Sequence, residues 1–425
     1  MLLPEYKLVK LKSGLRCLLV PNKYIDSVNV SIIFRVGSRC EEENVAGISH
    51  FLEHMFFKGT KKRPQAKHIS EAVDSVGGTM NAFTSYEYTG YYIKVAKQHV
   101  GLAVDVLSDM ILNSKFEQKE INRERNVVKE EMKMYEDNPL SYIWRLWNGV
   151  LYGEHGLGRD IAGTRQALDN IDHRAMVGYR DSYYSVVNGL LVVVGNFSSE
   201  AMVKELDKRW ARISAGKKSV FAAVSEKQQE PQLVLLTKDI QQANFCVGVR
   251  TYPAFHKNHY ITQLLSVVLG QGMSSRLFLK VRERNGLAYS INSSVDNYTD
   301  VGNLVVKTGT DADKALKALA MILAEMKKIT EEKVGAKELN KAKEYWKGNL
   351  VLSLEYAESL ANMVGIQELL FDKVIEPKAM MKKIDAVTAT DIQRVAQDIF
   401  QSSKLNLAVI GPYKSSAKFK QILKI

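Results

Sequence analysis

The chain has 425 residues, of which 46% are hydrophobic and 25% are charged. These fractions are close to the average for soluble globular proteins, and the length exceeds one ordinary core, so two or three domains are expected. The sequence contains no run of about 18 apolar residues that could span a bilayer, and no secretory h-region near its start. We therefore expect a cytoplasmic protein that has no membrane-spanning segment.

The formal net charge of +12 raises the question of a nucleic-acid partner. However, the Lys and Arg residues are mixed with Glu and Asp along helical stretches, and no long basic run or aromatic-basic motif occurs. This pattern favours a solvated surface over nucleic-acid binding. The cysteines Cys17, Cys40 and Cys246 are widely spaced, which argues against a disulfide framework or a CxxC metal site and predicts reduced, structural thiols.

Hydrophobic periodicity in the first half predicts strands and helices that arrive in clusters and not as regular βαβ units. In chain order the expected elements are strand-like runs at 15–21 and 27–39, helices at 48–57 and 68–76, a strand-like stretch at 80–96, a helix at 97–112, a long amphipathic stretch at 119–152 and an apolar strand at 189–197.

The second half repeats this order at similar lengths. Its expected elements are a strand-like stretch at 232–252, a helix at 262–270, a strand-like stretch at 287–309, helices at 311–329 and 336–369, and a closing strand at 404–413. The fold predicted is α+β, with two related domains that each contain a mixed, mainly antiparallel sheet and helices packed on one face. We place the domains at 1–213 and 233–425, joined by the polar, aperiodic linker 214–232.

The stretch HFLEHMFFKGT, residues 50–60, carries two histidines and a glutamate on an expected helix. Residues three and four apart share a helix face, so His50, Glu53 and His54 project together. Two such imidazoles can hold Zn²⁺, and HxxEH is the inverzincin motif. The alternative is a pair of core histidines beside a surface Glu. The corresponding helix of the second half, LLSVVLGQG, has neither residue type, so packing is the weaker explanation.

A third ligand is expected on the long helix that reads NRERNVVKEEMKMYED. Glu124 and Glu131 are seven residues apart and share a face, whereas Glu130 points about 100° away from Glu131. We therefore predict Glu131 as the third ligand and Glu124 as a carboxylate that orients an imidazole. The alternative is that both belong to an ordinary solvated helix surface.

Glu53 is then the carboxylate left free of the metal. Beside Zn²⁺ it can take a proton from the attacking water and later return it to the leaving amine. That combination is the chemistry of metal-assisted peptide hydrolysis.

These motifs resemble the pitrilysin family of zinc peptidases, in the short two-domain form similar to the mitochondrial and bacterial processing peptidases. The similarity covers nearly the whole chain. Its most specific segments are VGSRCEEENVAGISHFLEHMFFKGT, GGTMNAFTSYEYTGYY, ERNVVKEEMKMYED, HGLGRDIAGT and LGQGMSSRLFLKVRERNGLAYSI. Val186 departs from the family, which often has Pro there.

Carried over residue by residue, the resemblance implies one zinc ion per chain held by His50, His54 and Glu131, with Glu53 as general base and Glu124 in support. It further implies two groups of substrate-binding residues. Those that hold the substrate backbone as an added strand are Asn81, Ala82, Phe83 and Thr84. Those that contact substrate near the scissile bond are Arg282 and Tyr289.

The function expected is that of a zinc metalloendopeptidase that degrades or processes unfolded peptides in an enclosed dimeric chamber. The resemblance implies a homodimer in which the second domain of the partner chain completes each site. The charge pattern and the absence of a long apolar run predict neither nucleic acid nor membrane as partner. One alternative is a non-catalytic structural or partner subunit of a peptidase-like heterodimer. Another is an active chain that needs a different, inactive partner.

Overall fold

The computed structural model describes residues 5–425 and divides the chain into two compact units. Unit 1 comprises Met1–Met132, Asp160–Ala222 and Val351–Pro377, and unit 2 comprises Lys133–Arg159, Ala223–Leu350 and Lys378–Ile425. These units differ from the contiguous ranges 1–213 and 233–425 in two segments, 133–159 and 351–377, which pack with the opposite half. The contiguous boundaries stay a prediction about the sequence repeat.

Unit 1 contains a six-stranded sheet with the order β1-β2-β6-β3-β5-β4. Its strands are β1 (Lys7–Lys10), β2 (Arg16–Pro21), β3 (Ser27–Phe34), β4 (Thr79–Thr84), β5 (Thr89–Ala96) and β6 (Gly189–Gly195). Only the β2–β6 pair is parallel, and the other pairs are antiparallel. β4 is therefore an edge strand, with one side of its backbone not paired in the sheet.

Unit 2 contains a five-stranded sheet with the order β7-β11-β8-β10-β9. Its strands are β7 (Gln232–Thr237), β8 (Gln242–Thr251), β9 (Ser290–Asn297), β10 (Gly302–Asp311) and β11 (Asn406–Gly411). The closing strand β11 pairs in parallel with β7, as β6 does with β2 in unit 1, and all other pairs are antiparallel. The two related α+β halves with mixed, mainly antiparallel sheets are thus confirmed.

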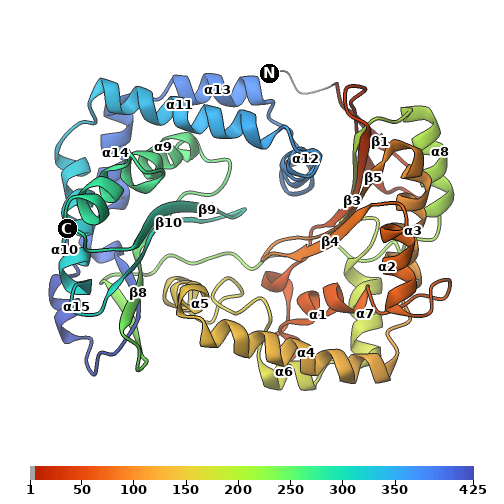
Figure 1. Cartoon of the computed structure of the whole chain (residues 1–425), viewed down its shortest axis with the longest axis horizontal. Helices are drawn as coiled ribbons and strands as arrows, with labels where there is room; N and C mark the ends of the chain where they lie inside the picture. The colour runs from red at the N-terminus through yellow and green to blue at the C-terminus, as the bar shows by residue number, and fades with distance from the viewer. Residues whose placement is uncertain (1–4) are drawn as a thin grey trace. The chain divides into compact units, whose positions relative to one another are not determined.

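Each unit combines its sheet with helices of its own (Figure 1). Those of unit 1 are α1 (Ile48–Met55), α2 (Ala66–Asp74), α3 (Val100–Asn113), most of α4 (Gln118–Asp137), α6 (Arg165–Asp169), α7 (His173–Tyr183), α8 (Ser199–Arg209) and α12 (Ala357–Phe371). Those of unit 2 are α5 (Pro139–Tyr152), α9 (His259–Gly270), α10 (Ala315–Glu331), most of α11 (Ala336–Ser353), most of α13 (Pro377–Asp385), α14 (Ala389–Ile399) and α15 (Ala417–Ile422).

The exchanged helices α5 and α12 explain why the central strands are buried at almost every position. In unit 1, Ile32 and Phe34 of β3 join a core with α1 and α3. The opposite face of the same sheet is covered by α12, where a Cβ on Gly365 would lie 2.8 Å from Ile33 and 2.9 Å from Val192. In unit 2, α5 packs on β8 and β11. One helix from each half therefore completes the sheet of the other.

Five stretches expected as single elements are each divided into two. Residues 80–96 form the hairpin β4–β5, and 232–252 and 287–309 also contain two strands each. The long stretch 119–152 is interrupted where Asn138 caps α5 by accepting from the Leu140 amide, with Pro139 at the first helical position. Proline cannot donate the hydrogen bond that would continue α4, so the chain starts a new helix there. The expected helix 336–369 is likewise divided into α11 and α12.

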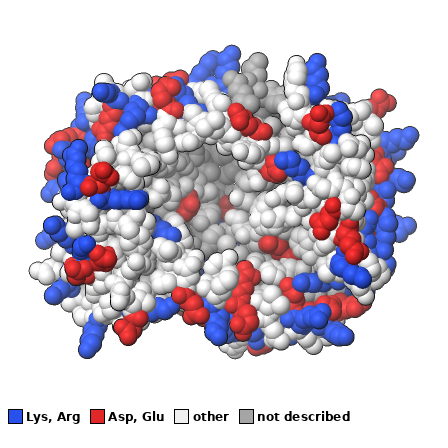
Figure 2. Space-filling model, viewed as in Figure 1, with Lys and Arg blue, Asp and Glu red and all other residues white. Residues whose placement is uncertain are grey.

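The surface carries both charge signs. Figure 2 shows Lys and Arg side chains interspersed with Asp and Glu on the face it presents. Pairs such as Lys129 with Asp169, at 2.6 Å, account for part of this mixing. Within residues 5–425 no helix is both long enough and apolar enough to cross a membrane. The three cysteines are free thiols, and burial raises the pKa of Cys40 to about 11.

Candidate metal centre

The start of α1 is fixed by a buried carboxylate and two glycines. Glu41 accepts hydrogen bonds from the backbone amides of Gly47 at 2.6 Å and Ser49 at 2.8 Å, which satisfies donors that the first turn of a helix leaves free. Gly47 has a φ of +98°, and a Cβ there would lie 2.3 Å from the Ala162 carbonyl oxygen. A Cβ on Gly163 would lie 1.9 Å from the Ala46 oxygen. These close approaches set where α1 begins.

The apolar face of α1 anchors the helix in the core of unit 1. Phe51, Leu52 and Phe56 are fully buried, and the neighbouring Phe57 is partly buried against the same core. The opposite face presents the polar residues of the motif toward α4.

α4 supplies the acidic residues from its own anchored face. Ile121, Val128 and Met132 are buried, and Glu124 lies among them with 3% of its surface exposed. Glu131 is partly exposed, whereas Glu130 is exposed and lies outside the cluster of possible metal ligands. The seven-residue spacing therefore places Glu124 and Glu131 along the side of α4 that faces α1.

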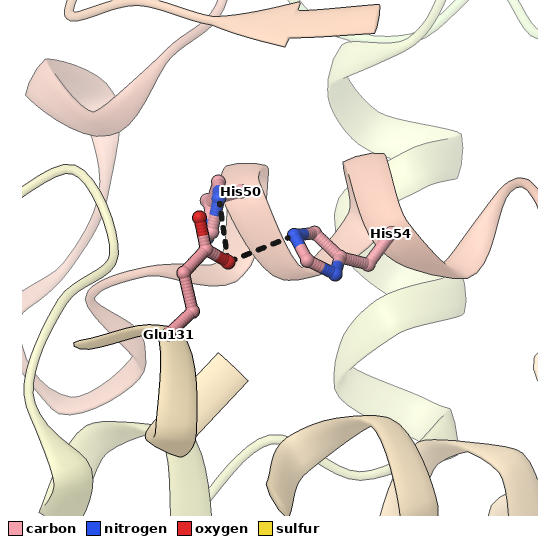
Figure 3. Close-up of side chains that lie close together, drawn as sticks. All are labelled: His50, His54 and Glu131. Carbon is pink, nitrogen blue, oxygen red and sulfur yellow. Dashed lines mark ion pairs between the residues drawn. The ribbon is translucent and has the colours of Figure 1, made fainter. Parts of the chain in front are cut away.

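His50, His54 and Glu131 form a compact cluster, as Figure 3 shows. One ligand atom from each lies within 4.8 Å of the other two. The Glu131 Oε2 atom is 3.8 Å from His50 Nε2 and 3.4 Å from His54 Nε2. Two imidazole nitrogens and one carboxylate oxygen therefore converge on a single point between α1 and α4.

This donor set fits zinc. A tetrahedral ion with bonds of about 2.0–2.2 Å spaces its ligand atoms about 3.4 Å apart, close to both distances from Glu131. Three protein ligands of the His₂Glu type leave a fourth position for water or substrate, as in catalytic zinc sites. Among residues 5–425 this is the one group of three His, Cys, Asp or Glu side chains that meets the distance test.

Glu124 supports the cluster from behind. Its Oε1 lies 2.9 Å from His54 Nδ1, and its Oε2 lies 2.7 Å from the ammonium of Lys58. A carboxylate on Nδ1 makes that nitrogen the donor and leaves Nε2 with the lone pair that a metal requires. His50 lacks such support in the described chain, because its Nδ1 is buried without a hydrogen-bond partner.

The electrostatics of the cluster favour a positive charge beside α4. Burial lowers the pKa of His54, but hydrogen bonds to Glu124 and Glu131 outweigh it and raise that pKa to about 9. The hydrogen bond from His54 lowers the pKa of Glu131 despite its partial burial. For His50, burial and the neighbouring His54 lower the pKa to about 4. Two ionised carboxylates therefore face the histidines, as a cation site requires.

Glu53 lies on the same helix face in a different environment. Burial raises its pKa, although the Thr84 hydroxyl opposes this by donating to Glu53 Oε2 at 2.5 Å. Thr84 is the last residue of β4, so the contact joins the base candidate to the edge strand. Asn81, Ala82 and Phe83 precede it on β4, and they are exposed or partly exposed.

Arg282 and Tyr289 belong to unit 2. Arg282 is exposed at the end of a short π-helix, η4 (Phe278–Glu283), with its guanidinium 4.8 Å from the centre of the Phe278 ring. Tyr289 is 38% exposed, and its hydroxyl lies 3.4 Å from Asn244 Oδ1. Gly309 has no side chain to displace the Tyr289 ring, which would lie 2.4 Å from a Cβ there.

The structure brings together the residues that the sequence predicts as ligands, base and supporting carboxylate, but sequence reasoning missed three contacts that hold them. These are the Glu41 cap of α1, the Lys58 ion pair with Glu124 and the Thr84 hydroxyl bonded to Glu53. Lys58 follows His54 by four residues, a spacing that places two helical residues on one face. Glu41 and Thr84 have no comparable spacing signal, because tertiary folding brings them to α1.

Comparisons with known proteins agree with this fold. Residues 16–165 match the family model described as Insulinase (Peptidase family M16), and residues 170–345 match the one described as Peptidase M16 inactive domain. An uncharacterized zinc protease of Bacillus subtilis is 36% identical over 401 residues, which cover 94% of this chain and 97% of that protein. One from Rickettsia felis is 35% identical over 409 residues, covering 96% and 98% respectively.

A crystal structure of a protease from Helicobacter pylori has the same fold, with a TM-score of 0.89 at 23% identity. The match covers 96% of this chain and 100% of that one. The two-unit architecture of this chain is thus that of the solved protease. The chain belongs to peptidase family M16, and the two relatives above carry the name uncharacterized zinc protease. The first family match contains the whole cluster, and the second contains Arg282 and Tyr289.

Proposed function

We propose that this chain is a zinc metalloendopeptidase that hydrolyses unfolded peptides or short polypeptides. The observation that carries the proposal is the convergence of His50, His54 and Glu131 within 4.8 Å, with Glu53 on the same face of α1. The three ligands would hold one zinc ion per chain. Zinc, when bound there, supplies a Lewis acid that acidifies a water and polarises a carbonyl.

The chain's own residues would perform the proton transfers. Glu53 accepts a proton from the attacking water and delivers it to the leaving amine, a task that suits a carboxylate whose pKa is raised by burial. The Thr84 hydroxyl holds one Glu53 oxygen, which leaves the other oxygen free for the water. Glu124 keeps the His54 ring oriented throughout.

The edge strand β4 is the proposed binding site for the substrate backbone. Asn81, Ala82, Phe83 and Thr84 lie on the side of the sheet that has no neighbouring strand. A peptide that adds a strand there would be held by backbone hydrogen bonds, which accept many sequences. The Glu53–Thr84 contact places the base next to that strand.

We further propose a homodimer that encloses the substrate in a chamber. By the resemblance to the short processing peptidases, Arg282 and Tyr289 of one chain would act at the zinc site of the partner chain. A guanidinium and a phenol can donate hydrogen bonds to a carbonyl oxygen as negative charge develops on it. Both side chains are at least partly exposed in unit 2, as this role requires.

The competing candidate is a non-catalytic subunit, since residues 170–345 match a domain described as inactive. That match does not contain the histidines or the glutamates of the cluster, which lie in residues 16–165. Zinc content and peptide hydrolysis distinguish the two candidates. We expect about one zinc per chain and cleavage of unfolded peptides that a chelator abolishes and added zinc restores. Stoichiometric zinc without cleavage would favour the non-catalytic subunit.

A further inference from the structure

Lys58 lies three residues after the end of α1, in a turn that continues the helical path. Its backbone amide donates to the Met55 carbonyl at 3.2 Å, so the helical path continues through the turn after the helix. The side chain therefore projects along the same face as His54, four residues earlier. Its Nζ lies 2.7 Å from Glu124 Oε2, while the other oxygen of that carboxylate is 2.9 Å from His54 Nδ1.

We propose that Lys58 is a positioning residue for the zinc site, acting through Glu124 on His54. This inference rests on the proposed zinc site. Lys58 fixes the Glu124 carboxylate at its second oxygen. Glu124 then holds the His54 ring in the orientation that directs Nε2 to the point where it meets Glu131, 3.4 Å away.

The physical reason is that one hydrogen bond does not fix a carboxylate. The terminal torsion of a Glu side chain is broad, so a carboxylate held at one oxygen can rotate about it. Only 4% of the Glu124 side chain is exposed, which leaves its second oxygen little access to water if Lys58 is removed. Burial of an unpaired charged oxygen is costly, so the carboxylate would then turn away from His54.

The two histidines differ in what holds their rings in place. His54 is held through a chain of two charged contacts, Lys58 to Glu124 and Glu124 to His54. His50 is held by the packing of α1, since its Nδ1 lacks a partner in the described residues. The loss of Lys58 would therefore disturb one ligand of three, which predicts a weakened zinc site and not an abolished one.

A purely electrostatic account predicts the opposite sign. Lys58 is a positive charge near a cation site, so removing it should strengthen zinc binding if Coulomb repulsion were the main effect. If orientation is the main effect, removing Lys58 weakens binding, as loss of a partner behind a ligand typically does by about 10–100-fold. The direction of the change in zinc affinity therefore decides between the two accounts.

The test measures zinc dissociation constants of the full-length protein by competition with a chromogenic chelator. Lys62, four residues after Lys58, provides a matched control. Its ammonium lies 2.5 Å from Asp105, and neither residue belongs to the cluster. We expect Lys58→Met to raise the dissociation constant at least about tenfold. Lys62→Met should leave it unchanged, and Lys58→Arg, which retains a charged donor, should keep most of the affinity.

A double-mutant cycle with Glu124→Gln tests the route through Glu124. We expect Lys58→Met to have little further effect on zinc affinity once Glu124 is changed. Unchanged or tighter zinc binding by folded Lys58→Met would overturn the proposal, and so would an undiminished loss in the Glu124→Gln background. If Lys58→Met lowers the unfolding midpoint of the zinc-free protein, the zinc titration and the cycle are carried out with Lys58→Gln instead of Lys58→Met. Failure of the wild type to bind zinc would instead refute the proposed function.

Discussion

At the scale of single residues, Glu53 and Glu131 show how one cluster can give two carboxylates different tasks. Glu131 accepts from His54, which lowers its pKa and keeps it ionised. Glu53 has its pKa raised by burial, with the Thr84 hydroxyl as an opposing influence. Environments that separate the pKa values of two neighbouring acids are typical of sites where one acid binds and the other moves protons. In the proposed function, Glu131 would therefore bind the metal and Glu53 would move the proton.

This assignment predicts different consequences for two substitutions. Glu53→Gln keeps the size of the side chain but removes the base, so we expect kcat for peptide hydrolysis to fall about 10²–10⁴-fold while zinc stays bound. Glu131→Gln should reduce zinc content itself. Metal analysis beside peptide hydrolysis checks both, with wild type as reference. Loss of zinc from Glu53→Gln, or full activity in that variant, would contradict the division of roles.

A histidine outside the site makes stability depend on pH. His259 is the first residue of α9, and burial lowers its pKa from 6.5 to about 4, against an opposing hydrogen bond to Asn297. Its Nδ1 is buried without a partner among the described residues. The folded state therefore binds fewer protons than the unfolded state between these two pKa values. Stability is full above the unfolded pKa and falls as the pH drops toward about 4.

We expect His259 to remove about 2 kcal/mol of stability between pH ~7 and pH ~5, as follows from the two pKa values by linkage. The measurement is the thermal unfolding midpoint of wild type and of His259→Asn at both pH values. Comparing the two proteins cancels the contribution of every other titrating group. An equal fall of the midpoint in both proteins would show that His259 does not carry this dependence.

At the scale of elements, the position of α1 depends on backbone contacts that a side chain would disrupt. Gly47 combines a φ of +98° with a Cβ site 2.3 Å from a backbone oxygen of Ala162. We expect Gly47→Ala to destabilise the fold by about 2 kcal/mol or more, since both strain and a backbone clash oppose it. Because α1 carries both histidines, zinc affinity should fall as well.

Gly178 is the matched control, since it lies inside α7 of the same unit with nothing within 4 Å of its Cβ site. Gly178→Ala should be neutral or stabilising by up to about 1 kcal/mol. Chemical denaturation and zinc titration of both variants check the comparison. If Gly47→Ala were as stable as Gly178→Ala, the loop at Ala162 would have to move aside without loss of folding free energy, and the prediction would be wrong.

The sequence predicts features that depend on spacing within one helix better than features that depend on contacts between distant elements. His50, Glu53, His54, Glu124 and Glu131 were predicted as a set because helix spacing alone places them on two faces, and the structure brings those faces together. The division of 80–96 into β4 and β5 was missed because a strand pattern does not locate a four-residue turn. The exchange of α5 and α12 was missed for another reason: an amphipathic helix does not specify which sheet it covers.

At the scale of the whole molecule, this exchange makes the two halves interdependent. α12 covers the apolar face of β3 and β6 in unit 1, and α5 covers β8 and β11 in unit 2. A half cut at the sequence boundary would expose the sheet face that the other half's helix covers, at a cost of about 25 cal/mol per Å² of apolar surface. Experiments on the proposed shared site therefore need the full chain, with substitutions as the only change.

The last prediction tests whether each site is shared between two chains. Glu53→Gln removes the base in unit 1, and Tyr289→Phe removes the phenol in unit 2, so each homodimer should be nearly inactive. In a mixed dimer, one site would combine the intact Glu53 of one chain with the intact Tyr289 of the other. Random pairing of equal amounts makes half of the dimers mixed, so activity should recover to about a quarter of wild type, as twofold symmetry requires.

A chain that carries both substitutions provides the control. With this chain, a shared site gives the lower residual activity and a site confined to one chain gives the higher. Mixed one to one with wild type, it would inactivate both sites of every mixed dimer if sites are shared, leaving about a quarter of the activity. If each site used residues of one chain only, about half would remain, and the Glu53→Gln and Tyr289→Phe mixture would recover nothing. Co-expression of differently tagged chains, with peptide hydrolysis per purified dimer, separates these outcomes. A site confined to one chain would remove Arg282 and Tyr289 from the proposed partner-completed mechanism while leaving the zinc cluster of α1 and α4 intact.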